Sequence, residues 1–170
     1  MDTDVIEMIL GNCLKNTATN FLGVFPRDLI PDPISLTNFP ACLVANTDTH
    51  DQPGTHWVAF YFNSCSDIEF FDSYGQSPSS YSILITANVM NPTTLQSIYT
   101  DVCGHYCIYF LYKRSLSIPF HAIIASLTTS RSCVDNNVKL FVNNLILTHH
   151  IHVPTHCTRQ CSVCRCNWKK

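Results

Sequence analysis

The sequence predicts a single-domain protein of the α+β class, in which a strand hairpin packs with several helices. The first observation is a pair of short apolar segments, 56–62 and 68–71, joined by a polar turn at 63–67. The second is the nearly apolar segment 104–114, which ends in two cations and is typical of a buried helix. The third is segment 135–147, where apolar residues recur at helical spacing. A chain of 170 residues can bury one such core.

The remaining elements follow in chain order. Residues 4–15 predict an N-terminal helix, because apolar residues recur at helical spacing and acidic residues stand at its start. Four prolines then predict an irregular segment over 26–40. The apolar run 41–45 predicts a short buried strand, and the Ser-, Gly- and Pro-rich stretch 73–80 predicts a loop.

The composition excludes several classes of protein. Hydrophobic residues make up 46% and charged residues 13%, which is unlike a disordered chain. A formal net charge of -2 argues against a generally basic surface that coats nucleic acid. No apolar run approaches the roughly 20 residues of a membrane span. The acidic N-terminus is unlike a secretory signal peptide, so we expect an intracellular protein whose ten cysteines are mostly reduced.

Three residues have the types and positions that thiol hydrolysis requires. Cys103 stands at the start of a predicted helix, where the helix dipole favours a thiolate. Gly104 after it is expected to let a substrate backbone approach closely. His56 opens one strand of the predicted hairpin and Asp72 closes the other, so the two side chains should meet at one end of the sheet. They are candidates for the base and for the group that orients it.

Longer motifs surround these residues. The string QSIYTDVCGHYC, from Gln96 to Cys107, resembles the nucleophile motif of the adenovirus-type maturation proteases, where a Gln stands seven residues before a Cys-Gly pair. The string GTHWVAF at 54–60 is similar to that family's His-Trp strand, and FFDSYG at 70–75 is similar to its acidic strand end. Segments 20–25 and 41–47 resemble its early Phe-Leu-Gly segment and its first core strand. The resemblance covers about residues 21–111.

The resemblance implies a role for each matching residue. Cys103 would be the nucleophile, His56 the general base and then acid, and Asp72 the group that fixes the imidazole. Gln96 would donate a side-chain N–H to the oxyanion, beside the backbone N–H of Cys103. Cys107 would be a packing thiol. The implied fold is a papain-like core in permuted order, with an antiparallel sheet packed on a central helix that carries the nucleophilic cysteine. Asp replaces the adenoviral Glu, as it does in the wider SUMO-protease relatives.

The resemblance also suggests substrates and partners. The first hypothesis is a cysteine endopeptidase that matures viral or virus-like precursor proteins, located in the virion and in the nucleus or cytoplasm of the host cell. The alternative within the same fold is a deubiquitinase or SUMO-type isopeptidase. The Gln-to-Cys spacing of seven, one longer than in typical SUMO proteases, favours the endopeptidase.

A third hypothesis comes from another class: a catalytically inactive binding protein whose Cys-rich tail recognises nucleic acid.

Adenoviral members are activated by a peptide, bonded through a cysteine that follows the acidic residue, and by DNA. Here residues 73–95 contain no cysteine and the net charge is negative, which argues against both activators.

The C-terminal end differs in composition, so we expect a protease domain over 1–150 and a Cys/His-rich tail over 151–170. The tail could ligate zinc through His156, Cys157, Cys161, Cys164 and Cys166. The alternatives are a flexible, reduced tail and disulfides formed within a virion. Catalysis by the thiol is expected to require no metal or other cofactor.

Overall fold

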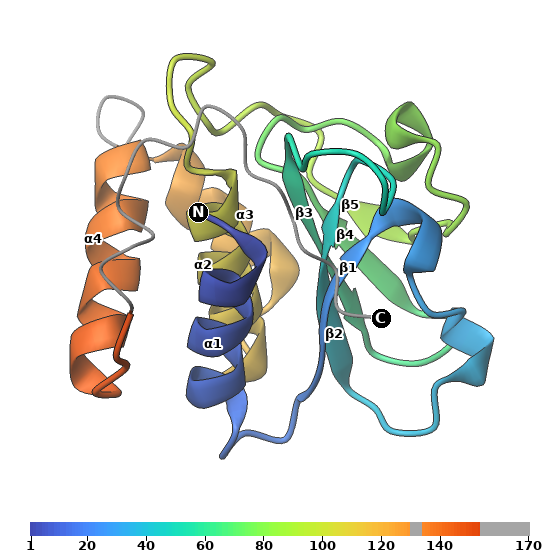
Figure 1. The fold of residues 1–170 in the computed structure, drawn as a ribbon, viewed down its shortest axis with the longest axis horizontal. Coiled ribbons are helices and arrows are strands. Elements are labelled where there is room, and N and C mark those ends of the chain that lie inside the picture. Colours follow the sequence, from blue (N-terminus) through green and yellow to red (C-terminus); the bar gives the residue numbers. More distant parts are fainter. Residues whose placement is uncertain (130–133, 154–170) are drawn as a thin grey trace.

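Helices stack on one face of a five-stranded sheet in the computed structural model, which describes residues 1–129 and 134–153 (Figure 1). The helices are α1 (Thr3–Leu14), α2 (Cys103–Ser115), α3 (Phe120–Thr128) and α4 (Val134–Thr148). The strands are β1 (Asn20–Pro26), β2 (Ala41–Asn46), β3 (Trp57–Phe62), β4 (Ile68–Phe71) and β5 (Val89–Met90). Three short 3-10 helices are η1 (Arg27–Leu29), η2 (Pro33–Ser35) and η3 (Pro78–Tyr81). The predicted α+β class is therefore correct.

The sheet is mixed and has the order β1-β2-β3-β4-β5. The inner strands β2, β3 and β4 are antiparallel, and the predicted hairpin forms with Ala59 paired to Phe71. Both edge pairs are parallel, so the prediction of an antiparallel sheet is wrong at the edges. The reason is the connections: residues 27–40 and 72–88 carry the chain back along the sheet before the next strand begins.

The sheet is buried on both faces, which explains why β2 and β3 contain no exposed residue. One face packs on the helices through Cys42, Val44, Trp57, Ala59, Tyr61 and Phe71. The other face packs under the segments around η1, η2 and η3 through Ala41, Leu43, Ala45, Val58, Phe60, Phe62, Ile68 and Phe70. The period of two along each strand assigns alternate side chains to the two cores.

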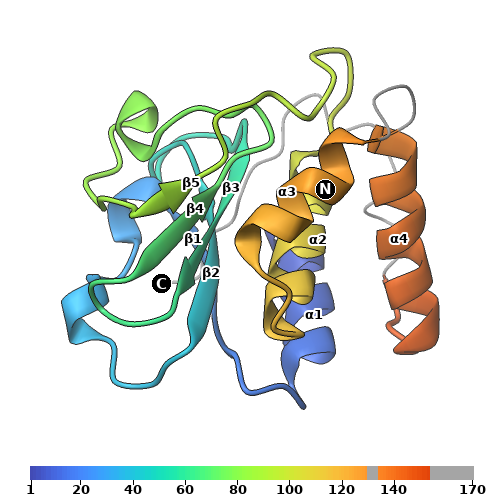
Figure 2. The same cartoon turned by 180° about the vertical axis from the view of Figure 1, so that it is seen from behind.

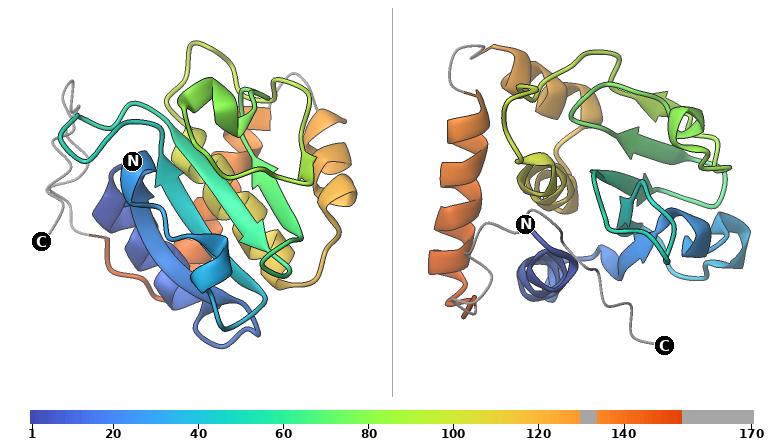
Figure 3. Two further views of the ribbon diagram at one scale, coloured as in Figure 1. Left: turned by 90° about the vertical axis from the view of Figure 1, so that its right-hand side faces the viewer. Right: turned by 45° about the horizontal axis from the view of Figure 1, so that its top comes forward.

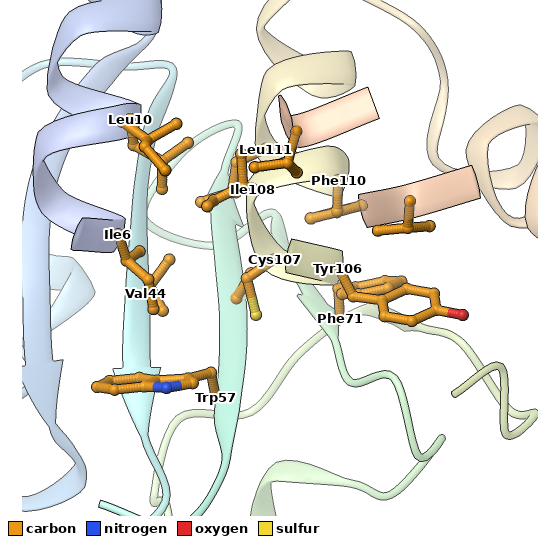
Figure 4. Packing of buried hydrophobic residues seen from close by; sticks show 14 of the residues in the cluster. Ile6, Leu10, Val44, Trp57, Phe71, Tyr106, Cys107, Ile108, Phe110 and Leu111 are labelled. Carbon is orange, nitrogen blue, oxygen red and sulfur yellow. The ribbon is translucent and has the colours of Figure 1, made fainter. Parts of the chain in front are cut away.

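Helix α2 lies at the centre of the helical layer. In the right-hand view of Figure 3, α1 and α2 lie between α4 and the sheet, and Figure 2 shows α3 against α2 from behind. Ile6 of α1 and Val44 of β2 lie close to Ile108 and Cys107 of α2 in the core (Figure 4). Helix α2 contacts the sheet, α1, α3 and α4. Because it is covered on several sides, its sequence is apolar almost all round.

Arg114, one of the two cations near the end of α2, has a structural role beyond its interaction with the helix dipole. Arg114 makes two hydrogen bonds to the Glu69 carboxylate, of 2.7 and 3.0 Å, and its guanidinium lies over the Tyr61 ring at 4.5 Å. Both charged side chains are nearly buried, so this pair ties α2 to β4 in a setting where losing one partner is costly.

The helix-side core includes a residue just past position 150, where the protease domain was expected to end. Ile151 belongs to the helix-side core, and its N–H donates to the Ile146 carbonyl at 2.9 Å. The five candidate zinc ligands of the tail lie outside the described residues. Within residues 1–129 and 134–153, no helix is both long and apolar enough to cross a membrane.

Candidate active site

The end of the β3–β4 hairpin brings His56 and Asp72 together. His56 directly precedes β3 and Asp72 directly follows β4, so the antiparallel register places both at one end of the sheet. His56 Nε2 lies 2.6 Å from Asp72 Oδ1. The two residues are 7% and 0% exposed, so this charge-assisted hydrogen bond is shielded from water.

The Asp72 carboxylate is held by several donors besides His56. The N–H of Tyr74 donates to Oδ1 at 3.0 Å, while the N–H of Gln76 and the hydroxyl of Tyr81 donate to Oδ2 at 2.9 and 2.8 Å. Burial acts to raise the pKa of Asp72, but the His56 bond and the backbone donors outweigh it, so the pKa lies below its usual value. The carboxylate is therefore ionised and fixed in orientation.

Asn91 holds the backbone of the same residue. Its side-chain Oδ1 accepts from the Asp72 N–H at 3.0 Å, and its Nδ2 donates to the Asp72 carbonyl at 2.6 Å. These two hydrogen bonds resemble those that the backbone of a neighbouring strand would make to Asp72, just beyond the end of β4. Asp72 is thereby fixed through both its main chain and its side chain.

The His56 imidazole is held between its partners and two tyrosine rings. Its ring stacks on Tyr74, with centroids 4.7 Å apart, and Tyr81 lies at 5.7 Å on a tilted plane. Burial acts to lower the pKa of His56, but hydrogen bonds to Asp72 and Cys103 overcome it and raise the pKa to about 9. At neutral pH the imidazole is therefore protonated in this environment.

Cys103 is the first residue of α2 and is half-buried beside His56. Its neighbour Gly104 is buried, and a Cβ there would lie 3.1 Å from Ile6 Cδ1. A larger side chain there would press on Ile6, so Gly104 has a packing role where α2 meets α1, beside the expected close approach of a substrate. Cys107, one turn later, is 1% exposed, and burial raises the pKa of its thiol well above normal. It packs in the core as predicted.

Gln96 is 2% exposed and is joined to the same site through the segment after Asp72. Its Oε1 accepts from the Ser73 hydroxyl at 2.8 Å, and its backbone N–H donates to the Ser73 carbonyl at 3.1 Å. Its Nε2 donates to the Thr100 carbonyl and, at 3.3 Å, to the hydroxyl of Tyr74. The structure therefore links all four predicted residues through direct contacts or through Tyr74.

A separate hollow of about 460 Å³ lies at the opposite end of the sheet. Its lining includes Leu14, Lys15, Asn20 and Phe21, and none of the four predicted site residues contributes to it. Asn20 pairs with Ala41, which pairs with Phe62, whereas His56 adjoins the other end of β3. This hollow is distinct from the candidate active site.

No protein-family model and no curated protein matches the chain. The X-ray structure of the C-terminal Ulp1 protease domain, in complex with Smt3, the yeast ortholog of SUMO, matches with a TM-score of 0.52 and 14% identity over 89% of this chain and 78% of that chain. The chain has a Ulp1-like fold.

A second solved structure is the central domain of an uncharacterized Lpg1148 protein from Legionella pneumophila. It matches with a TM-score of 0.48 and 13% identity over 86% of this chain and 97% of that chain. The Ulp1-like fold rests on the first likeness.

Sequence reasoning missed the residues that support the candidate site. Ser73 and Tyr74 fell in a segment predicted as a plain loop, and Tyr81 and Asn91 lie in the connection that follows it. The only local signal was Asn91 before a proline, which is typical of a turn. Their roles depend on a return of the chain to Asp72 that the sequence pattern does not encode locally.

Proposed function

We propose that this chain is a cysteine protease in which Cys103 is the nucleophile. The observation that carries the proposal is the position of His56, between the buried Asp72 carboxylate and a half-buried thiol at the start of a helix. A thiol nucleophile, its base and a group orienting the base are the minimum set for acyl transfer. The Ulp1-like fold supports the same class.

The hydrogen bonds assign the two imidazole nitrogens to different tasks. Nε2 is engaged by Asp72, which leaves Nδ1 for Cys103. A protonated imidazole beside the sulfur favours the thiolate, which attacks the substrate carbonyl carbon. His56 then gives its proton to the leaving amine as the thioester forms. In the second half, neutral His56 takes a proton from water, which attacks the thioester and releases Cys103.

Stabilisation of the tetrahedral intermediate is assigned to Gln96 and to the backbone N–H of Cys103. Both N–H groups of the Gln96 amide are used within the protein, by the Thr100 carbonyl and the Tyr74 hydroxyl. The contact with Tyr74 is the longer, so it is the one that an oxyanion would replace. A negatively charged oxygen is a stronger acceptor than a phenol.

Within this class, the first candidate is a maturation endopeptidase for viral or virus-like precursor proteins. The Gln-to-Cys spacing of seven residues supports it. The second candidate is a SUMO-type isopeptidase or deubiquitinase, favoured by the likeness to the Ulp1 domain bound to Smt3. The partners are protein substrates in both cases, and virion, nucleus and cytoplasm remain the proposed locations.

The decisive experiment compares cleavable peptides and ubiquitin-like conjugates side by side, with and without DNA, for the wild type and Cys103→Ala. Cys65→Ala is the matched control, because Cys65 is an exposed thiol in the β3–β4 turn, remote from His56 in the hairpin. We expect Cys103→Ala alone to abolish cleavage. Equal cleavage by Cys103→Ala and the wild type would refute the proposal. Preference for peptides or for ubiquitin-like conjugates distinguishes the maturation endopeptidase from the isopeptidase or deubiquitinase.

A further inference from the structure

Segment 95–102, which carries Gln96 and leads directly into α2, is fastened at several points by one carboxylate. Asp135, in the first turn of α4, accepts from the Ser97 N–H at 3.2 Å and from the Thr100 hydroxyl at 2.6 Å through Oδ2. Its Oδ1 accepts from the Tyr106 hydroxyl of α2 at 2.8 Å. The carboxylate thus joins three parts of the chain.

These contacts enclose Gln96. Ser97 follows it directly, and Thr100 offers the carbonyl that accepts from Gln96 Nε2. The Tyr106 hydroxyl also lies 3.2 Å from the carbonyl of Leu95, the residue before Gln96. Ser73 holds Gln96 from the sheet side. Asp135 therefore holds the opposite side of the segment, without contacting Gln96 itself.

We infer that Asp135 is a positioning residue that keeps the Gln96 amide aimed at the reacting carbonyl of the substrate. The inference rests on the proposed function, because it assigns Gln96 to the oxyanion. An oxyanion donor must be in place before the reaction to be effective, since reorienting it during the reaction costs free energy. Asp135 keeps the donor in place from α4, a helix that is remote in sequence, and it does not touch the reacting atoms.

The alternative is that Asp135 serves only the stability of α4, as an acidic residue in a first turn does. Asp4 is the matched control, because it is an exposed aspartate in the first turn of α1. Substituting each by Asn removes the same charge from the same kind of position. Only Asp135→Asn also replaces one of the two carboxylate oxygens, which together accept from the Ser97, Thr100 and Tyr106 donors, by an amide NH₂ group that cannot accept.

The test separates chemistry that needs an oxyanion donor from chemistry that does not. Alkylation of Cys103 by iodoacetamide requires the thiolate but forms no oxyanion, whereas peptide cleavage requires both. For Asp135→Asn we expect kcat to fall by about 10- to 100-fold with KM nearly unchanged, within the limit of about 10²–10³-fold for losing one donor. The alkylation rate should stay within about twofold of wild type, and Asp4→Asn should leave both rates unchanged.

A double-mutant cycle identifies the group through which Asp135 acts. In a Gln96→Ala background, Asp135→Asn should cause little further loss, because the donor it positions is already absent. Full additivity would overturn the inference, as would equal losses of cleavage and alkylation. Thr100→Val gives a second route if Asp135→Asn does not fold, since it leaves the carboxylate in place and removes the hydroxyl that joins Thr100 to Asp135 and to the Ser97 carbonyl. An unchanged kcat in that variant would also count against the inference.

The outcomes also distinguish this inference from the proposed function. A wild-type protein that cleaves, with Cys103→Ala inactive and Asp135→Asn fully active, would leave the protease assignment standing and remove the role of Asp135. A wild-type protein that cleaves no better than Cys103→Ala would overturn both.

Discussion

Replacing Asp72 by Asn should change how the stability of the protein depends on pH. The pKa of His56 rises from 6.5 to about 9 in the folded chain, which corresponds to about 3 kcal/mol of preferential stabilisation of its protonated form. Because the folded pKa is raised, this contribution is fully present below pH 6.5 and is lost as the pH rises through about 9. The hydrogen bond to Asp72 is the largest of the effects that raise this pKa, and Cys103 adds to it.

In Asp72→Asn the charge opposite His56 is gone, and burial acts to lower the pKa of the imidazole. The free energy of unfolding of the variant should therefore be well below that of the wild type near pH 6. The gap should narrow by up to about 3 kcal/mol by about pH 9.5. The lowered pKa of Asp72 itself affects stability only where the pH falls through the acidic range, so it does not alter this window.

The measurement is a series of urea unfolding curves in reducing buffer, from about pH 6 to about pH 9.5, for the wild type and the variant. Groups that titrate alike in both proteins, such as thiols remote from the site, contribute equally to both free energies of unfolding. Their contributions therefore cancel in the difference between wild type and variant. Asp67→Asn is the control, because Asp67 is an exposed residue of the β3–β4 turn, and its effect should be small and independent of pH. A constant gap between wild type and Asp72→Asn over the whole range would refute the reasoning.

Three further predictions concern activity and the tail. A thiol-reactive probe should label Cys103 first, and Cys103→Ala should abolish turnover while Cys107→Ala keeps most of it; similar losses in both, with the fold intact, would contradict the assignment. Gln96→Ala should lower kcat by about 10²–10³-fold with little change in KM, and an effect confined to KM would instead make it a substrate-binding residue. A chelator should leave peptide cleavage intact whether or not segment 154–170 binds zinc; loss of activity that zinc restores would show that the tail and the core act as one unit.

The parts of the fold that were predicted from the sequence are those with strong local patterns. The β3–β4 hairpin has alternating residues around a polar turn, α2 is apolar almost all round and ends in two cations, and α4 has apolar residues at helical spacing. The sequence was enough to predict that His56 and Asp72 are neighbours, because an antiparallel hairpin determines which strand ends meet. The register of β3 and β4 then brings the two side chains within hydrogen-bond distance.

The parts that were missed depend on contacts between distant segments. β1 contains Gly23 at a φ of 121° and pairs in parallel with β2 across a proline-rich connection, so no hairpin signal marks it. β5 is two residues long and has no measurable period. Asp135 was predicted only as the start of a helix, because its partners lie 29 to 38 residues away. Side chains that position a site from that distance leave no local pattern.

The double anchoring of Asp72 by Tyr81 and Asn91 has a use in engineering. Tyr81 lies in the connection between β4 and β5, Asn91 directly follows β5, and Leu84 between them is 96% exposed. Lengthening an exposed loop costs only about 0.6 kcal/mol for each doubling of its length. A foreign peptide or a small reporter domain inserted at Leu84 should therefore be tolerated, since Tyr81 before the insertion holds the Asp72 carboxylate and Asn91 after it holds the Asp72 backbone. The same position offers a starting point for libraries that graft new recognition loops onto this scaffold.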